Sequence, residues 1–218
     1  MIELRLTGDG SHTLFVPEMN EHYHSIHGAI QESMHIFITQ GFDTCESNEI
    51  NILEIGLGTG LNVFLTALRQ KGSCKSVKYT AIEKYPVSKE FAEKLNYHNL
   101  IPEASQELFR YIHTSPWDCE VEISKSFILR KIERDATTSI PEGSYNLIYF
   151  DAFGPDKQPE MWTPDVFRKI AEYTQPGGIL VTYSAKGHVK RTLRDCGFNV
   201  KLMPGPPGKR HIIRALKN

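Results

Sequence analysis

A glycine-rich stretch offers the clearest chemistry in the sequence. The apolar run "INILEI" is followed at once by Gly56, Gly58 and Gly60, and an amphipathic run opens with Leu61. Glycines let the backbone turn sharply and let a ligand approach closely. A dinucleotide fingerprint has the spacing GxGxxG, whereas the spacing here is GxGxG. Because S-adenosylmethionine carries no phosphate, the tighter loop can accept its amino-acid portion, and Glu54 suits the same interpretation. Alone, the loop is equally typical of a tight turn between a strand and a helix.

Two further acids lie where a nucleoside cofactor would need them. Glu83 ends the run "VKYTAIE", about 20 residues beyond the glycines, which is the usual place for a carboxylate that binds ribose hydroxyls. Asp135, in "ERDATT", follows the next predicted strand and can hold an adenine amino group. A helix N-cap aspartate has the same appearance as Asp135. The glycines and Glu83, in register with two strands, therefore predict a nucleoside cofactor.

A third carboxylate stands at the end of another apolar run. Asp151 follows "YNLIYF" and opens the aromatic- and proline-rich stretch "DAFGPDKQPEMWT". A carboxylate in this place can hold an amine with its lone pair aimed at a methyl donor, and such positioning is most of the catalysis in a methyl transfer. Phe153 can stack on a base or pack near a cationic sulfonium. The competing interpretations are a turn cap for Asp151 and core packing for Trp162 and Phe167.

The elements that must position these residues alternate from residue 50 onward. Apolar runs predict strands at 50–55, 77–82, 145–150 and 179–183, and amphipathic runs predict helices at 61–70, 87–95, 164–174 and 187–196. Such alternation indicates an α/β fold with a mostly parallel sheet and helices on both faces. Ligands bind beyond the carboxyl ends of such strands, where the glycines, Glu83 and Asp151 all fall. Residues 119–139 predict a hairpin, and "FNVKLM" and "KRHIIRAL" predict a closing antiparallel pair.

The first 45 residues have a different pattern. Residues 1–18 predict a short strand or hairpin, and residues 20–41 predict a helix because Ile26, Ile30, Met34 and Ile38 recur at helical spacing. We therefore expect an N-terminal extension, residues 1–45, packed on a Rossmann-like domain, residues 46–218. The histidines of "HYHSIH" lack the cysteines or carboxylates of a metal site, so no metal is predicted.

Bulk composition narrows the class of protein. The chain has 218 residues, enough for one α/β domain, and its formal net charge of −1 excludes a globally basic nucleic-acid binder but not a local basic patch. No apolar run approaches the length of a membrane span. The four cysteines form no CxxC pair, which suits a reducing compartment, and a cytoplasmic protein is predicted.

Several segments together resemble one family. "NEHYHSIHGAIQESMHIF", "LEIGLGTGLN", "YTAIEKYP", "DAFGPDKQPEMWT", "GGILVTYSAKGHVKRTLRDCGF" and "GPPGKRHIIRA" resemble the MnmC-type and MnmD-type tRNA methyltransferases, from about Met19 to Ala215. The resemblance implies a class I S-adenosylmethionine-dependent fold, with a seven-stranded sheet whose last strand is antiparallel. It also implies methyl transfer to the aminomethyl group of 5-aminomethyl-(2-thio)uridine at the tRNA wobble position.

The resemblance also implies roles for single residues. Asp151 would hold the target amine beside Phe153, and the N-terminal helix would cover the pocket, with Tyr23 and His24 in its wall. FAD is not expected, because the oxidase half of the bifunctional members is absent up to Asn218. The residues that would hold S-adenosylmethionine are Glu32, Glu54, Gly56, Gly58, Gly60, Glu83 and Asp135.

A late basic cluster is the candidate RNA contact. It can grip the phosphates of a tRNA anticodon loop, although a solvated basic helix face is the competing interpretation. Two other functions stay open: a class I methyltransferase acting on another amine, and a non-catalytic tRNA-binding factor. The oligomeric state is not predicted. The candidate RNA-binding residues are Lys186, Lys190, Arg191, Lys209 and Arg210.

Overall fold

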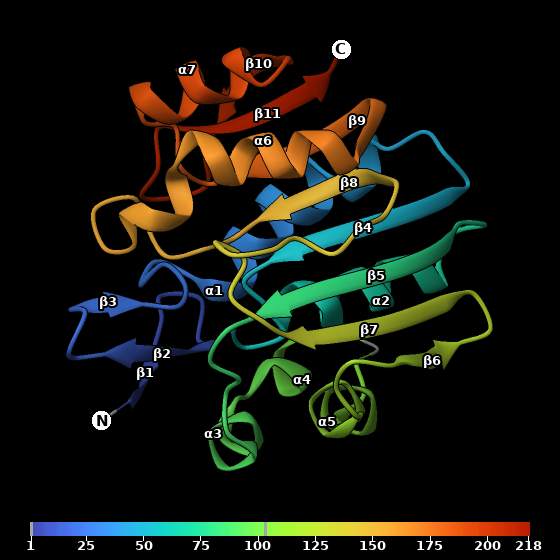
Figure 1. Ribbon diagram of the computed structural model, residues 1–218. Coiled ribbons are helices and arrows are strands. Elements are labelled where there is room, and N and C mark those ends of the chain that lie inside the picture. Colours follow the sequence, from blue (N-terminus) through green and yellow to red (C-terminus); the bar gives the residue numbers. More distant parts are fainter. Residues whose placement is uncertain (1, 103) are drawn as a thin grey trace.

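A sheet of eight strands, in the order β10-β11-β9-β8-β4-β5-β7-β6, forms the centre of the molecule (Figure 1). The computed structural model describes residues 2–102 and 104–218. Strands β7, β5, β4, β8 and β9 run parallel, and β11 is antiparallel to both β9 and β10. The strands are β4 (Glu49–Ile55), β5 (Ser76–Glu83), β6 (Glu120–Ser124), β7 (Phe127–Glu133), β8 (Tyr145–Phe150), β9 (Thr174–Thr182), β10 (Phe198–Pro204) and β11 (His211–Lys217).

The predicted class I α/β fold is confirmed, and so is the antiparallel last strand. The expected number of seven strands is wrong by one. The predicted hairpin at 119–139 forms β6 and β7, and β6 adds an antiparallel strand at the edge because it pairs with β7. Strand β9 begins five residues before the predicted start at 179, since Thr174 already pairs with Tyr145 of β8.

Helices cover both faces of the sheet. Helices α2 (Leu61–Lys71) and α5 (Gln106–Thr114) pack with β4, β5 and β7 in one hydrophobic cluster. Helices α6 (Pro164–Tyr173) and α7 (Gly187–Asp195) pack on the other face, where α6 crosses in front of the sheet in Figure 1. The segment between β5 and β6 holds α3 (Lys89–Lys94), α4 (Tyr97–Leu100) and α5; only α3 was predicted.

The N-terminal segment forms a second, three-stranded antiparallel sheet of β1 (Glu3–Leu6), β2 (His12–Val16) and β3 (Glu21–His22). Figure 1 shows this sheet beyond the arrowheads of β4, β5, β7 and β8. It therefore faces the carboxyl ends of the parallel strands, where ligands bind in open α/β sheets.

The predicted helix at 20–41 is wrong in its first half. Helix α1 (Ala29–Ser33) begins only after Gly28 and continues as a π-helical turn, η1 (Met34–Thr39). Backbone groups before it are bonded elsewhere: β3 pairs with β2, and the His24 N–H donates to the Thr13 hydroxyl at 3.0 Å. The helical spacing of Ile26 was coincidental, since this side chain is 57% exposed.

The N-terminal segment shares the core of the sheet. Leu14, Phe37 and Phe42 are buried in the same hydrophobic cluster as β4 and α2. The division of the chain at residue 45 stays a prediction. Two short 3₁₀ turns, η2 (Phe42–Thr44) and η3 (Pro159–Trp162), complete the elements described. In the part of the chain that the structure describes, no helix is long and apolar enough to cross a membrane.

Candidate active site

A cavity of about 510 Å³ opens at the carboxyl ends of the parallel strands. Its wall combines the loop after β4, the ends of β5, β7 and β8, and the N-terminal segment, including Tyr23 and His24. Gly60 and Glu54 do not line it. Eight of the predicted site residues do: Glu32, Gly56, Gly58, Glu83, Asp135, Asp151, Phe153 and Lys209.

The glycine loop needs its glycines for two physical reasons. Gly56 and Gly58 have φ of +90° and +51°, in a region that side chains disfavour. A Cβ on Gly56 would also lie 2.8 Å from the carbonyl oxygen of Asp151. The first glycine therefore lets the loop after β4 pack directly on the backbone that carries Asp151.

Glu83 closes this loop from the neighbouring strand. Its two carboxylate oxygens accept hydrogen bonds at 2.9 Å from the N–H groups of Gly58 and Tyr85. Burial raises the pKa of Glu83, and these backbone donors oppose the rise. Each carboxylate oxygen has a second lone pair, so Glu83 can still accept the hydroxyls of a ribose in the cavity.

Asp135 caps a turn and not a helix, since the described residues between β7 and β8 form no helix. Its Oδ1 accepts hydrogen bonds from the Thr137 N–H and hydroxyl, at 2.9 and 2.6 Å, as a turn cap does. Its Oδ2 pairs with Lys84 at 2.9 Å. The Thr137 hydroxyl and Lys84 lower the pKa of Asp135 to about 2. The capped carboxylate nevertheless lines the cavity, where it remains a hydrogen-bond acceptor.

Asp151 lies directly after β8, at the floor of the cavity. Its N–H donates to the Ile55 carbonyl at 2.9 Å, which fixes the backbone beside the glycine loop. Its Oδ2 accepts a hydrogen bond from the Asn62 amide at 2.8 Å. Burial raises the pKa of Asp151 well above its usual value, and the charge of Glu32 adds to the rise. A carboxyl group with a raised pKa is a stronger base than an exposed aspartate.

The loop after Asp151 is held by two aromatic donors. The Tyr183 hydroxyl donates to the Ala152 carbonyl at 2.8 Å, and the Trp162 indole N–H donates to the Phe153 carbonyl at 2.7 Å. Trp162 is 3% exposed and packs on Phe150, so the core interpretation of this residue is correct. The Phe153 ring lies in the cavity wall, edge-on to Tyr23 at 4.9 Å between ring centroids.

An ion pair joins the two ends of the chain at the cavity rim. Glu32 is 8% exposed, unlike a solvated helix-face glutamate, and pairs with Lys209 at 2.6 Å. The Ser25 N–H donates to the other Glu32 oxygen at 2.8 Å. Lys209 also lies 5.2 Å from the centroid of the Tyr183 ring. Lys209, predicted from sequence to contact RNA, thus forms part of the cavity itself.

A second groove of about 430 Å³ adjoins the cavity and shares Lys209 and Tyr183 with it. Lys186 and Arg210 also line this groove, and Lys186 forms an ion pair with Asp156. The other two predicted RNA contacts, Lys190 and Arg191 of α7, line neither the cavity nor the groove.

The sequence-based prediction missed Asn62 and Tyr183. Asn62 lies in the first turn of α2, immediately behind the third glycine, and Tyr183 follows β9 directly. A polar residue one turn after a glycine loop, or at the carboxyl end of a neighbouring strand, was the signal that could have found them.

One of the N-terminal histidines, His24, contacts the glycine loop. The His24 Nε2 lies 2.7 Å from the Thr59 hydroxyl, and the Tyr97 hydroxyl donates to the same oxygen at 3.2 Å. Burial lowers the pKa of His24 to about 4, so its ring is neutral and can accept from Thr59. No group of three or more His, Cys, Asp or Glu side chains among the described residues could hold a metal ion.

Similar proteins place this geometry in context. The tRNA 5-methylaminomethyl-2-thiouridine biosynthesis bifunctional protein MnmC of Campylobacter hominis is 29% identical over 209 residues, 94% of this chain and 31% of its own length. The MnmC of Stutzerimonas stutzeri is 30% identical over 88% of this chain and 31% of its own length. The chain thus spans about a third of the length of the curated relatives it matches.

Solved structures agree with this picture. The crystal structure of MNMC2 from Aquifex aeolicus superposes with a TM-score of 0.79 at 29% identity, over 99% of this chain and 70% of the other. A methyltransferase from Pyrococcus furiosus, 18% identical with a TM-score of 0.50, shares the fold over 81% of this chain and 79% of its own.

A family model described as S-adenosyl-L-methionine-dependent methyltransferase matches residues 100–218, which hold Asp135, Asp151 and Lys209. This match covers more than half of the chain, and the glycine loop and Glu83 complete the same cavity from outside it. The chain is therefore a member of this family of S-adenosyl-L-methionine-dependent methyltransferases.

Proposed function

We propose that this protein methylates the aminomethyl group of 5-aminomethyl-(2-thio)uridine at the wobble position of tRNA, giving the methylaminomethyl product. The observation that carries the proposal is the Asp151 carboxylate on the floor of a cavity that also contains the glycine loop and Glu83. The printed names of the MnmC relatives, which belong to 5-methylaminomethyl-2-thiouridine biosynthesis, supply the substrate.

The residues of the cavity suit S-adenosylmethionine. Glu83 can accept the ribose hydroxyls and Asp135 can accept from the adenine amino group, while Gly56 and Gly58 keep the loop open to the rest of the cofactor. Glu32 is the candidate acid for the cofactor's ammonium group, and it already forms an ion pair with Lys209. When bound, the cofactor supplies an electrophilic methyl group on a sulfonium.

Asp151 is the candidate group for the amine. An alkyl ammonium has no lone pair, so the substrate must lose a proton before its nitrogen can attack. The raised pKa of Asp151 lets this carboxylate accept that proton and then hold the amine by a hydrogen bond. The backbone carbonyls of Ala152 and Phe153, fixed by Tyr183 and Trp162, keep the surrounding loop in one geometry.

The adjoining groove is the candidate path for the anticodon loop. Lys209 and Arg210 lie along it, and Lys186 stands at the same rim, partly neutralised by Asp156. These cations would contact phosphates, which fixes register without reading the base. We infer that Lys190 and Arg191, outside the groove, contribute less to RNA affinity than Lys209 and Arg210.

The decisive experiment uses tRNA that carries the aminomethyl group and lacks only the final methyl. The protein is incubated with this tRNA and methyl-labelled S-adenosylmethionine, and nucleosides are separated and weighed by mass spectrometry. We expect label in 5-methylaminomethyl-(2-thio)uridine. Label on another amine with none on this nucleoside would favour the alternative methyltransferase, and tRNA binding without cofactor binding in calorimetry would favour a non-catalytic factor.

A further inference from the structure

Three polar side chains, Glu54, Asn62 and Asp151, are joined by hydrogen bonds between helix α2 and the sheet, and we call this group the polar seam. Because side chains alternate along a strand, Tyr149 and Asp151 fall on the same face as Leu147, which packs in the α2 cluster. Glu54 lies on this face of β4, between Ile52 and the glycine loop. This face is otherwise apolar, so each polar side chain in it requires a partner.

Asn62 is the link within this seam. Its Nδ2 donates to Asp151 Oδ2 at 2.8 Å and to Glu54 Oε1 at 2.9 Å. One amide group, 2% exposed in the first turn of α2, therefore joins two carboxyl groups. Thr66 holds the next turn of the helix, since its hydroxyl donates to the Asn62 carbonyl at 2.6 Å.

Glu54 has an environment that a charged carboxylate would not tolerate. Its exposed fraction is 0%, no basic side chain is bonded to it, and its Oε2 has no hydrogen-bond partner among the described residues. The Asn62 Oδ1 is unpartnered in the same way. The Tyr79 hydroxyl lies near enough to Glu54 to lower the pKa of this carboxyl group, but the effect of burial, which raises the pKa, is larger. A buried ionised carboxylate without a counter-charge is far more costly than its neutral acid.

Asp151 differs because the cavity reaches it. Asp151 and Lys209 both line this cavity, and the charge of Lys209 lowers the pKa of Asp151. Two negative charges joined by one amide would repel each other, so one of the two carboxyl groups is expected to be neutral. The charge of Lys209 favours ionisation of Asp151.

We propose that Asn62 is a positioning residue that orients and charges the Asp151 carboxylate, and that Glu54 holds Asn62 from behind as a neutral carboxylic acid. The role of Asp151 toward the amine rests on the proposed function, whereas the protonation states of the free protein do not. Glu54 thus acts through Asn62 and Asp151, and the cofactor-binding role predicted for it is replaced in this proposal by a supporting one.

Other ionisable groups near the polar seam also affect the titration of Asp151. Glu32 raises the pKa of Asp151, and Lys209 lowers it. Burial raises the pKa of Tyr79 and Tyr183 well above the usual tyrosine value, so both hydroxyls stay neutral. The charges of Glu32 and Lys209 therefore act on the titration of Asp151 directly, and those of Asp151 and Glu83 act on Glu54.

The test is a titration of the free protein labelled with ¹³C at its carboxyl groups. NMR signals of Asp151 and Glu54 are assigned with the variants Asp151→Asn and Glu54→Gln. We expect the Glu54 signal to stay at the position of a protonated acid through neutral pH. In Asn62→Leu, loss of one hydrogen bond to a charged group should raise the titration midpoint of Asp151 by about 1–2 pH units.

A matched control and a second variant keep the result decisive. Asn146 lies at the other end of the same sheet, where its amide bonds the Glu49 carbonyl, and Asn146→Ala should leave the Asp151 midpoint unchanged. Should Asn62→Leu not fold, Glu54→Gln decides alone, since it keeps shape and acceptor and should also leave that midpoint in place. Three results would overturn the proposal. The first is a Glu54 signal that titrates below pH 6. The others are a lower Asp151 midpoint in Glu54→Gln and an unchanged Asp151 midpoint in Asn62→Leu.

Activity supplies a separate measurement. With aminomethyl tRNA as substrate, Asn62→Leu should lower kcat and shift the acidic midpoint of the kcat–pH profile to higher pH. The KM for S-adenosylmethionine should be unchanged. If the proposed substrate is wrong, this arm gives no signal, while the NMR midpoints still test the seam.

Discussion

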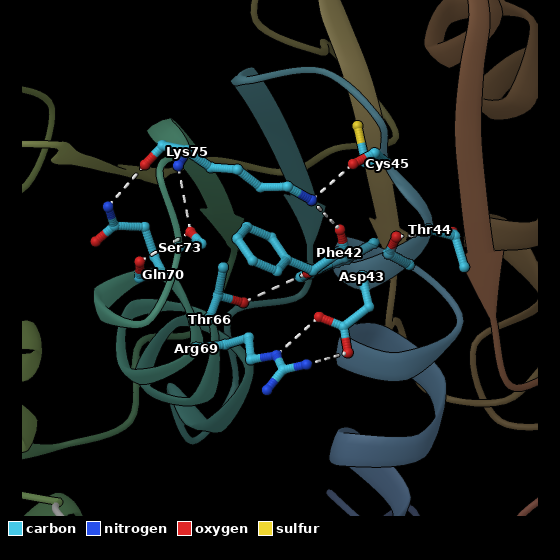
Figure 2. Close-up of polar contacts among 11 residues, drawn as sticks. Phe42, Asp43, Thr44, Cys45, Thr66, Arg69, Gln70, Ser73 and Lys75 are labelled. Atoms are coloured by element: carbon cyan, nitrogen blue, oxygen red, sulfur yellow. Dashed lines mark hydrogen bonds and ion pairs between the residues drawn. The ribbon is translucent and has the colours of Figure 1, made fainter.

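The two ends of helix α2 face polar groups of opposite character. At the cavity end, Asn62 joins two carboxyl groups whose pKa values are both raised well above the usual range by burial. At the far end, shown in Figure 2, Arg69 donates two hydrogen bonds to Asp43, at 2.8 and 3.1 Å. There the charges of Arg69 and Asp43 neutralise each other.

The far end is also closed by Lys75. Its ammonium donates to the carbonyls of Phe42 and Cys45, at 3.1 and 2.6 Å, and lies 4.8 Å from the centroid of the Phe42 ring (Figure 2). Gln70 donates to the Lys75 carbonyl at 2.7 Å. None of the side chains labelled in Figure 2 is among the unpartnered buried groups of the described residues.

The two ends differ in how completely their buried polar groups are hydrogen-bonded. Fully paired groups, as at Lys75, stabilise one conformation and offer nothing to a ligand. Partly satisfied groups, as at Glu54 and Asn62, cost stability and persist where a site needs them. The same helix therefore contacts the N-terminal segment through Arg69 at one end and holds the Asp151 carboxyl group through Asn62 at the other.

Removing the cavity carboxylate should have the largest effect. We expect Asp151→Ala to lower the rate of methyl transfer by about 10²–10⁴-fold, because the amine loses its acceptor and base. S-adenosylmethionine binding should be nearly unchanged. Single-turnover kinetics and calorimetry measure the two quantities, and Asp165→Ala, which removes an exposed aspartate of α6, is the control. Normal turnover in Asp151→Ala would remove this residue from the mechanism.

Acid should weaken the cavity end first. Burial lowers the pKa of both His24 and His113 from 6.5 to about 4, and both bond Thr59 in the glycine loop. Between pH 4 and pH 6.5 the unfolded chain binds more protons at these two histidines than the folded protein does. The contribution of the neutral histidines to folding stability is therefore complete above pH 6.5 and is lost as the pH falls toward 4. The loss is up to roughly 3 kcal/mol per histidine.

Hydrogen exchange and melting temperature measured against pH check this expectation. The loop at 56–60 should lose protection at a higher pH than the Lys75 end, and His24→Gln should flatten the pH dependence of the melting temperature. Equal loss of protection at both ends would contradict the comparison.

A methyl group on the first glycine should cost less. Gly56→Ala places a Cβ at positive φ, at about 1–2 kcal/mol, and also against the Asp151 carbonyl. Gly177 has φ of +76°, and no atom lies within 4 Å of the position that its added Cβ would take, so Gly177→Ala should show only the backbone cost. Denaturant melts measure stability, and calorimetry measures cofactor affinity. If the two variants lose the same stability and affinity, the contact with Asp151 is unimportant.

The smallest effects should come from the far end. Arg69→Ala breaks a partly exposed ion pair, worth about 0.2–1 kcal/mol, and Lys75→Met should cost roughly 1–2 kcal/mol. Neither should change the rate of methyl transfer once the protein is folded. Urea melts and turnover assays make the comparison, and a loss of rate in a folded Lys75→Met would show that the two ends are coupled.

The sequence predicted the parts of the site that local patterns encode. Apolar runs placed β4, β5 and β8 within one or two residues, and parallel strands bring their carboxyl ends together, so the glycine loop, Glu83 and Asp151 were placed at one edge. Long-range contacts carry no such pattern. The pairing of Glu32 with Lys209 and the Asn62 link depend on tertiary packing. Segment 20–28 was misassigned because bonds to β2 overrode a helical spacing.

The contact between the N-terminal segment and the β10–β11 loop governs the order in which the site can assemble. His35 donates to the Pro204 carbonyl and Lys209 to Glu32, across separations of 169 and 177 residues. Neither contact can form before residues 204–209 have been synthesised, and these come after every other residue that lines the cavity. The rim of the cavity is thus completed by the β10–β11 loop, which is synthesised after the glycine loop, Glu83 and Asp151.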